Sequence, residues 1–226
     1  MTTAKRIPLR DRVLPDYTHA EEMMNMITHI VGGAIGLLIL IGGILIGAAH
    51  RDVWAITTGC VYGILTCALF VVSSVYHGLP DGMGKRVMQV VDHCTIYFMI
   101  AGTYTPVLLV SIRQQSAAAA WIVFVVEWSC AMIAGTLTAI DLKKYSKLSM
   151  ICYLAMGWAI VAILGMTVRA LGTAGFLWLL SGGLCYSVGA VLYGLGKKHR
   201  YMHSIFHLFV NAGSLLQAIA ILFYVL

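Results

Sequence analysis

Long apolar stretches are the feature that most constrains the fold of this chain. Seven of them approach the ~20 residues that a helix needs to cross the hydrocarbon core of a bilayer. They lie at about 26–49, 53–76, 88–111, 118–140, 148–169, 173–195 and 203–226. The connections are short, so neighbouring helices should run antiparallel. The sequence therefore predicts an all-α membrane protein, built as a bundle of seven transmembrane helices.

Composition supports an integral membrane protein and excludes other classes. Hydrophobic residues make up 60% of the chain and charged residues 11%, which leaves too little polar surface to cover a soluble globule. The net charge of +6 comes from short basic clusters between the apolar stretches, without a continuous patch. We therefore expect membrane lipids as partners and no nucleic acid.

The distribution of lysine and arginine predicts how the bundle is oriented. Cytoplasmic loops of membrane proteins carry an excess of these residues. Twelve of the fifteen fall on the side of the N-terminus, and only Arg51, Arg113 and Arg169 fall on the other side. We expect residues 1–25 to form a cytoplasmic tail, residues 26–226 to form the transmembrane domain, and the C-terminus to lie outside. The expected location is the plasma (inner) membrane. The twelve residues are Lys5, Arg6, Arg10, Arg12, Lys85, Arg86, Lys143, Lys144, Lys147, Lys197, Lys198 and Arg200.

Two histidines stand at the start of the last apolar segment. His203 and His207 are four residues apart, which places both rings on one face of a helix, about 6 Å apart along the axis at ~1.5 Å per residue. This geometry suits chelation of a metal ion. The spacing is common in helices, however, so its meaning depends on what else lies at the same depth.

The predicted topology brings further polar residues to that depth. The second segment ends at His77 and the third begins with Asp92 about one turn in, both on the cytoplasmic side where His203 and His207 lie. Ionisable groups at membrane depth are costly, and they usually face the bundle interior, where they pair or bind an ion. We therefore expect these four side chains to meet at one site.

Three imidazoles with one open position are typical of a catalytic zinc site. The six cysteines form no Cys-x2-Cys pair, so thiolate ligands are not expected. Asp92 would orient a histidine or accept a proton from water activated by the metal. Ser73, one turn from His77 on the same face, would hydrogen-bond to that water or to a substrate carbonyl. The alternatives are interfacial histidines that merely pair, an acid at Asp92 that complements the helix dipole, and a Ser73 hydroxyl bonded to its own helix.

Other polar residues have less specific interpretations. His93 is displaced by ~100° from Asp92 on an ideal helix, so it is left out of the ligand set. Glu22, Asn25 and His29 lie at the cytoplasmic edge of the first segment, where His29 could line the site, and a polar cluster at the helix start explains all three equally well. Glu127, near the middle of the fourth segment, is expected to face the bundle interior, where a proton or ion path is the functional alternative.

Together these motifs resemble the progestin and adipoQ receptor superfamily, and in particular its bacterial hemolysin III-like branch. The resemblance covers essentially all seven segments. It implies that His77, His203 and His207 bind Zn2+, with Asp92 and Ser73 beside the metal. Alkaline ceramidases and adiponectin receptors in the wider group imply zinc-dependent hydrolysis of a lipid amide. The motifs are Ser73-x3-His77, Asp92, His203-x3-His207 and Glu22-x2-Asn25-x2-Thr28-His29-x2-Gly32.

Three functions are compatible with this pattern. The first is an enzyme that hydrolyses a lipid substrate presented from the inner leaflet, with Asp92 moving the proton and Ser73 holding the oxyanion or the water. The second is a sensor or membrane-homeostasis factor in which zinc is structural. The third is a hemolysin-like cytolytic protein, which the short loops and single bundle do not particularly favour.

Overall fold

The computed structural model describes residues 8–195 and 199–226, and these residues form helices without a β-strand. Lys5, Arg6, Lys197 and Lys198, which enter the charge count, lie outside the described residues. The elements are η1 (Leu9–Asp11), α1 (His19–Ala49), α2 (Val53–Gly78), α3 (Met83–Pro106), η2 (Val107–Ile112), α4 (Arg113–Gln115), α5 (Ala117–Ile140), α6 (Ser146–Gly157), η3 (Ala159–Ile163), α7 (Leu164–Leu195) and α8 (Met202–Tyr224).

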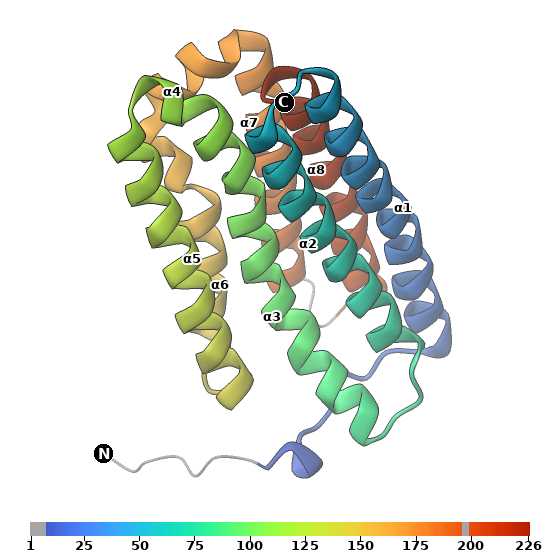
Figure 1. The fold of residues 1–226 in the computed structure, drawn as a ribbon. Helices are drawn as coiled ribbons and strands as arrows, with labels where there is room; N and C mark the ends of the chain where they lie inside the picture. The colour runs from blue at the N-terminus through green and yellow to red at the C-terminus, as the bar shows by residue number, and fades with distance from the viewer. Residues whose placement is uncertain (1–7, 196–198) are drawn as a thin grey trace, which may run out of the picture.

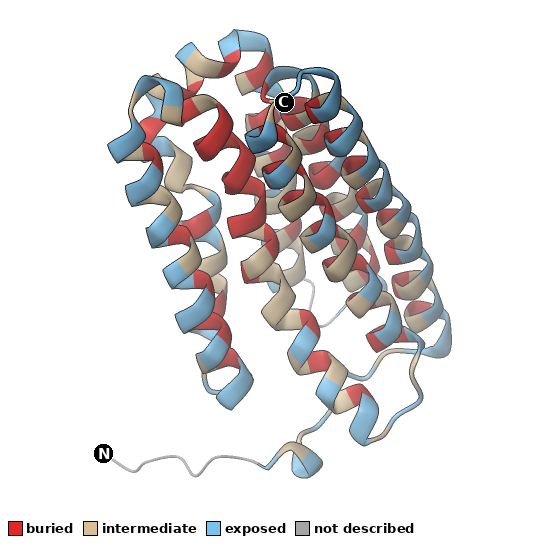
Figure 2. Ribbon diagram, in the orientation of Figure 1, coloured by how far each residue is buried: buried red, intermediate tan, exposed pale blue. Residues whose placement is uncertain are grey.

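The helices form one bundle with α3 at its centre (Figure 1). Helix α3 packs between α2 and α5, α1 packs against both α2 and α8, and α7 packs against α8. Residues 101–110, in the second half of α3 and in η2, are all buried (Figure 2). The π-helical segment η2 follows Pro106 directly, as expected where a proline removes a backbone hydrogen bond.

Six helical segments of the described chain are long and apolar enough to cross a membrane. The longest of them, Ser146–Leu195, contains two of the seven predicted spans. Gly172 interrupts it with φ 66° and ψ 171°, a left-handed conformation that favours glycine. The all-α fold with membrane-spanning helices is therefore confirmed. By length and composition, however, six helical segments of the described chain qualify as spans, whereas the sequence predicted seven.

Helix α1 begins at His19, seven residues before the start that hydropathy predicted. Its first turn is closed by a capping box, in which Thr18 Oγ1 accepts from the Glu21 N–H at 3.2 Å and Glu21 Oε2 accepts from the Thr18 N–H at 2.8 Å. Hydropathy does not detect this polar first turn. As a result, Asn25 and His29 lie well inside a regular helix and are buried.

Small residues allow close contact between α1 and α2. A Cβ added at Gly63 would lie 2.5 Å from Leu40 Cα, and one added at Gly47 would lie 2.6 Å from the Ile56 nitrogen. Both distances are shorter than side chains tolerate. These glycines therefore allow the two helix backbones to come into close contact. Such contact stabilises helix pairs in lipid, where no hydrophobic effect drives helices together.

Candidate metal centre

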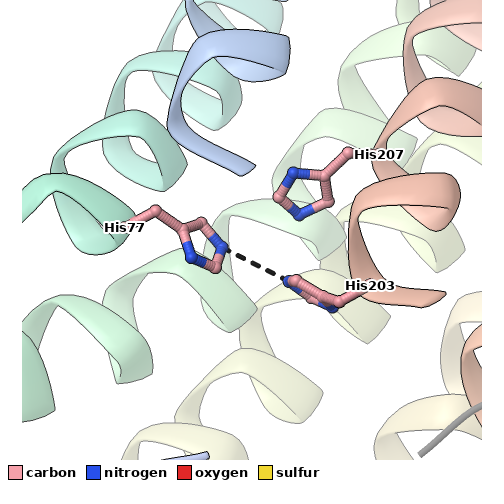
Figure 3. A group of neighbouring side chains, drawn as sticks. All are labelled: His77, His203 and His207. Atoms are coloured by element: carbon pink, nitrogen blue, oxygen red, sulfur yellow. Dashed lines mark hydrogen bonds between the residues drawn. The ribbon is translucent and has the colours of Figure 1, made fainter. Parts of the chain in front are cut away.

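The fold brings His77, His203 and His207 together at one end of the bundle. His77 lies at the C-terminal end of α2, and the other two occupy the first turns of α8. One ring nitrogen of each histidine lies within 4.8 Å of those of the other two. Figure 3 shows the three rings turned toward a common point, with 3.3 Å between His77 Nε2 and His203 Nε2. This cluster can hold a metal ion.

The burial of the three rings and the chemistry of their nitrogens fit a cation at the point where the rings meet. His77 and His207 are 3% and 2% exposed, and His203 is partly exposed. Converging neutral imidazole nitrogens offer lone pairs and no counter-charge, an arrangement that a bound cation satisfies. The donor set thus suits a metal ion that prefers imidazole nitrogen.

Glu22 on α1 holds the His77 ring. Glu22 Oε2 lies 2.5 Å from His77 Nδ1, and Glu22 Oε1 lies 2.6 Å from Lys85 Nζ. Because a carboxylate accepts, Nδ1 carries the proton and Nε2 presents its lone pair to the cluster. Carboxylate partners of this kind orient metal-binding histidines. The sequence placed Glu22 in a polar cluster at the helix start and did not predict its role as the partner of His77.

Helix α1 also holds His207. His207 Nδ1 lies 3.3 Å from both the Asn25 carbonyl oxygen and Thr28 Oγ1. Thr28 donates its own proton to that carbonyl at 2.9 Å, so its oxygen is free to accept from the imidazole. Residues 22, 25 and 28 share one face of α1, and this spacing was the available signal in the sequence.

Asp92 and Ser73 lie beside the cluster. Both line a cavity of about 190 Å3 whose wall also includes His203 and His207. Both side chains are buried, with Ser73 1% and Asp92 9% exposed. His93 Nδ1 instead faces the Gln89 carbonyl oxygen at 2.8 Å, and the ring stays outside the cluster, in agreement with its exclusion from the ligand set.

His29 is a fourth histidine at the site, and the sequence did not decide its role. Its ring stacks on that of His207, with centroids 3.6 Å apart and planes at 21°. It is buried, lines the cavity, and has no hydrogen-bond partner for either nitrogen among the described residues. Both nitrogens are thus buried beside the cluster without a partner in the described chain, although the ring itself lines the cavity.

Glu127 lies apart from this site. It faces the bundle interior of α5, as predicted, with 1% of its surface exposed. It belongs neither to the histidine cluster nor to the cavity wall, and its Oε2 has no hydrogen-bond partner in the described chain.

The segment before α1 covers the cluster. The Tyr17 ring stacks on that of His203, with centroids 5.1 Å apart and planes at 20°. Burial raises the pKa of the Tyr17 phenol, so the ring stays neutral at physiological pH. Arg200 joins this segment to α8 by contacts of 3.3 Å to the Asp16 carbonyl oxygen and 3.0 Å to Glu21 Oε2. The centre is therefore shielded by aromatic surface on this side.

The fold and the site define a multi-pass integral membrane protein with a candidate metal centre between α2 and α8. Comparison with known proteins then identifies the family. The chain belongs to the Haemolysin-III related family, whose family model matches residues 17–218.

Individual relatives cover nearly the whole chain. Hemolysin-3 of Bacillus cereus is 34% identical over 91% of this chain and 92% of its own length. The hemolysin-3 homolog of Bacillus subtilis is 32% identical over 92% of this chain and 96% of its own length. The human monocyte to macrophage differentiation factor is 30% identical over 96% and 88%, respectively. These matches confirm the hemolysin III-like branch of the predicted superfamily, and the bacterial relatives fit a location in the bacterial inner membrane.

Proposed function

We propose that the protein is a zinc-dependent hydrolase that cleaves a lipid amide at the cytoplasmic side of the membrane. The observation that supports this best is the position of three clustered histidines, Asp92 and Ser73 at one end of an otherwise apolar cavity. Hydrolysis of a lipid needs this combination, because polar catalytic groups must meet a substrate whose remainder is hydrocarbon.

His77, His203 and His207 would hold the zinc ion, with Glu22 and the start of α1 fixing two of the rings. When bound, zinc supplies a Lewis acid that polarises a carbonyl group and makes water more acidic. Asp92 and Ser73 line the cavity beside the cluster and would therefore face the substrate next to the metal.

The remaining chemistry falls to two side chains. The Asp92 carboxylate takes a proton from the attacking water, whose oxygen bonds to the carbonyl carbon, and returns the proton to the nitrogen as the C–N bond breaks. The Ser73 hydroxyl donates a hydrogen bond to the carbonyl oxygen as negative charge develops there. The products are a fatty acid and an amine.

The substrate would enter from the inner leaflet. Leu154 on α6 lines the cavity and is nevertheless 37% exposed, so this wall is thin. Helix α6 packs mainly against α5 and α3, whereas α7 packs against α8. The side between α6 and α7 is therefore the proposed entrance for a lipid chain.

This scheme includes seven crossings, with residues 1–25 as a cytoplasmic tail and the C-terminus outside. The break at Gly172 supports two crossings within Ser146–Leu195. The first described residues and Leu226 lie at opposite ends of the bundle, which an odd number of crossings requires (Figure 1). The excess of lysine and arginine on the N-terminal side supports the orientation.

The test is turnover by the purified full-length protein loaded with zinc, using a long-chain ceramide in mixed micelles. Wild type should release fatty acid, and Asp92→Asn should lower the rate by about 10²- to 10⁴-fold, the usual range for a general acid–base group. The metal content of both proteins should be equal. Equal rates in the two proteins, or no release from wild type with ceramide or N-acylethanolamine, would contradict the proposal.

A non-enzymatic role is the second candidate, and one observation favours it. The cluster joins α2 to α8, so a metal there would clamp the histidine end of the bundle. If the protein is a sensor or membrane-homeostasis factor, it should show no turnover, and removal of the metal by a chelator should sharply lower its thermal stability.

The name of the Bacillus cereus relative suggests a third candidate, a cytolytic role. The test is dye leakage from liposomes, and leakage that persists after removal of all three histidines would support this role.

A further inference from the structure

A second cavity of about 280 Å3 adjoins the one at the metal centre. Its wall includes Val107, Leu164, Phe176 and Leu179, from η2 and α7. The two cavities share six wall residues, which we call the neck: Thr103, Tyr104, Gly157, Trp158, Gly183 and Gln217. The two cavities, called chambers below, therefore meet at the neck.

The chambers are arranged along the bundle axis. Helix α3 contributes Asp92 to the first chamber, and Val107, directly after α3, belongs to the second. These residues are roughly 20 Å apart at ~1.5 Å per residue. The space therefore extends from the histidines through the neck toward the opposite end of the bundle.

Glycine keeps the neck open. A Cβ added at Gly183 or Gly157 would have no atom within 4 Å, so close packing does not require glycine at these positions. The neighbouring Gly182 is the opposite case, because its Cβ would lie 2.5 Å from Gln217 Cγ. Gly183 lines both cavities, and the lack of a side chain there leaves the space between them open.

The polar groups of the neck are largely bonded within the protein. The Tyr104 hydroxyl donates to the Gly157 carbonyl oxygen at 3.0 Å and accepts from the Ile160 N–H at 2.8 Å. Trp158 Nε1 donates to Ser187 Oγ at 3.0 Å, and Thr103 donates to the Met99 carbonyl oxygen at 2.9 Å. The passage thus presents mainly apolar surface, which suits a hydrocarbon chain.

We propose that the two chambers form one slot for a single extended acyl chain, and that Gly183 sets the longest chain that binds. This proposal rests on the proposed function, because that function places the lipid carbonyl at the histidines. The chain then runs through the neck, and its distal part occupies the second chamber. Chain-length selection is a property of the neck and the second chamber, separate from the chemistry at Asp92.

The test is the affinity of the purified, zinc-loaded full-length protein for saturated fatty acids of increasing length, measured by native mass spectrometry. Each methylene that becomes buried should raise the affinity about fourfold, from ~0.8 kcal/mol per CH2. In wild type the rise should continue until both chambers are full. In Gly183→Leu it should stop at a shorter chain, while the shortest acids bind as they do to wild type.

Two further variants complete the test. Gly33→Leu is the matched control, because a Cβ there also has no atom within 4 Å but Gly33 lines neither chamber, so its profile should equal that of wild type. Phe176→Ala enlarges the second chamber and should extend the rise to longer chains, which keeps the test decisive if Gly183→Leu does not fold.

The proposal would be overturned if the affinity of wild type and of Gly183→Leu stopped rising at the same chain length. It would also be overturned if Phe176→Ala had the same length profile as wild type, or if wild type bound no fatty acid. Failure of the hydrolase is distinguishable from these results. In that case ceramide is not cleaved, yet the length profiles of the variants still differ.

Discussion

Glu22 Oε2 on α1 lies 2.5 Å from His77 Nδ1 on α2, and the same carboxylate pairs with Lys85 on α3 at 2.6 Å. One acidic side chain thereby ties three helices to a ring of the metal cluster. The Lys85 charge keeps the carboxylate anionic in a largely buried place, so it can hold the imidazole in the tautomer that a metal requires.

We predict that Glu22→Gln weakens metal binding about 10- to 100-fold, the range typical for loss of a carboxylate that orients a metal-bound histidine. Competition with a chromophoric zinc chelator measures the affinity. Asp81→Asn is the matched control, because Asp81 also pairs with Lys85 but at 3.8 Å and with an 84% exposed side chain. Equal affinities of Glu22→Gln and wild type would remove Glu22 from the centre.

Tyr17 is predicted to control how fast the metal leaves. Its ring covers His203, so Tyr17→Ala should accelerate zinc removal by excess chelator several-fold, whereas Tyr17→Phe keeps the stacking ring and should resemble wild type. Stopped-flow absorbance of the chelator follows the release. If Tyr17→Ala and Tyr17→Phe release zinc at the same rate, the stacked ring does not shield the metal.

Ser73→Ala should lower ceramide turnover by about 10²- to 10³-fold and leave the zinc content unchanged, because the hydroxyl acts on the developing oxyanion and is not a ligand. The effect should appear in kcat more than in KM, since the interaction strengthens in the transition state. Loss of zinc from this variant would instead assign Ser73 to the metal site. Ser74→Ala is the control, because Ser74 bonds to the Phe70 carbonyl oxygen of its own helix.

Glu127→Gln should leave zinc binding and ceramide turnover unchanged, because Glu127 lies outside both the cluster and the cavities. Its carboxyl group is buried with an unpartnered oxygen, and a neutral amide of the same shape costs less to bury. The apparent Tm in detergent should therefore stay the same or rise. A fall in turnover at unchanged Tm would connect Glu127 to catalysis, against this account.

Much of the centre follows from sequence because it depends on depth and on helical periodicity. The length of α2 brings His77 to the same end of the bundle as the start of α8, and a spacing of four places His203 and His207 on one face. The depth of a residue in the membrane can be estimated from hydropathy and charge, and the helical face on which it lies follows from residue spacing. The three histidines, Asp92 and Ser73 were therefore predictable as neighbours.

Other features depend on how the helices pack side by side, which cannot be predicted from hydropathy. The bond between Glu22 and His77 requires α1 to begin at His19 and to turn a particular face toward α2, and close approach at Gly47 and Gly63 helps to set this packing. The two chambers are lined by residues of six helices that are distant in sequence, α1, α2, α3, α6, α7 and α8. The break at Gly172, by contrast, falls between the fifth and sixth segments that hydropathy predicted, 148–169 and 173–195, so its position agrees with the sequence.

The central claim is that three histidines form one metal centre, and metal content tests it most directly. Purified wild type, reconstituted with zinc and desalted, should carry about one zinc per chain by elemental analysis, and His207→Ala should carry close to none. His93→Ala is the control and should keep its zinc, because His93 lies next to Asp92 but outside the cluster. Equal zinc content in wild type and a folded His207→Ala would contradict the account.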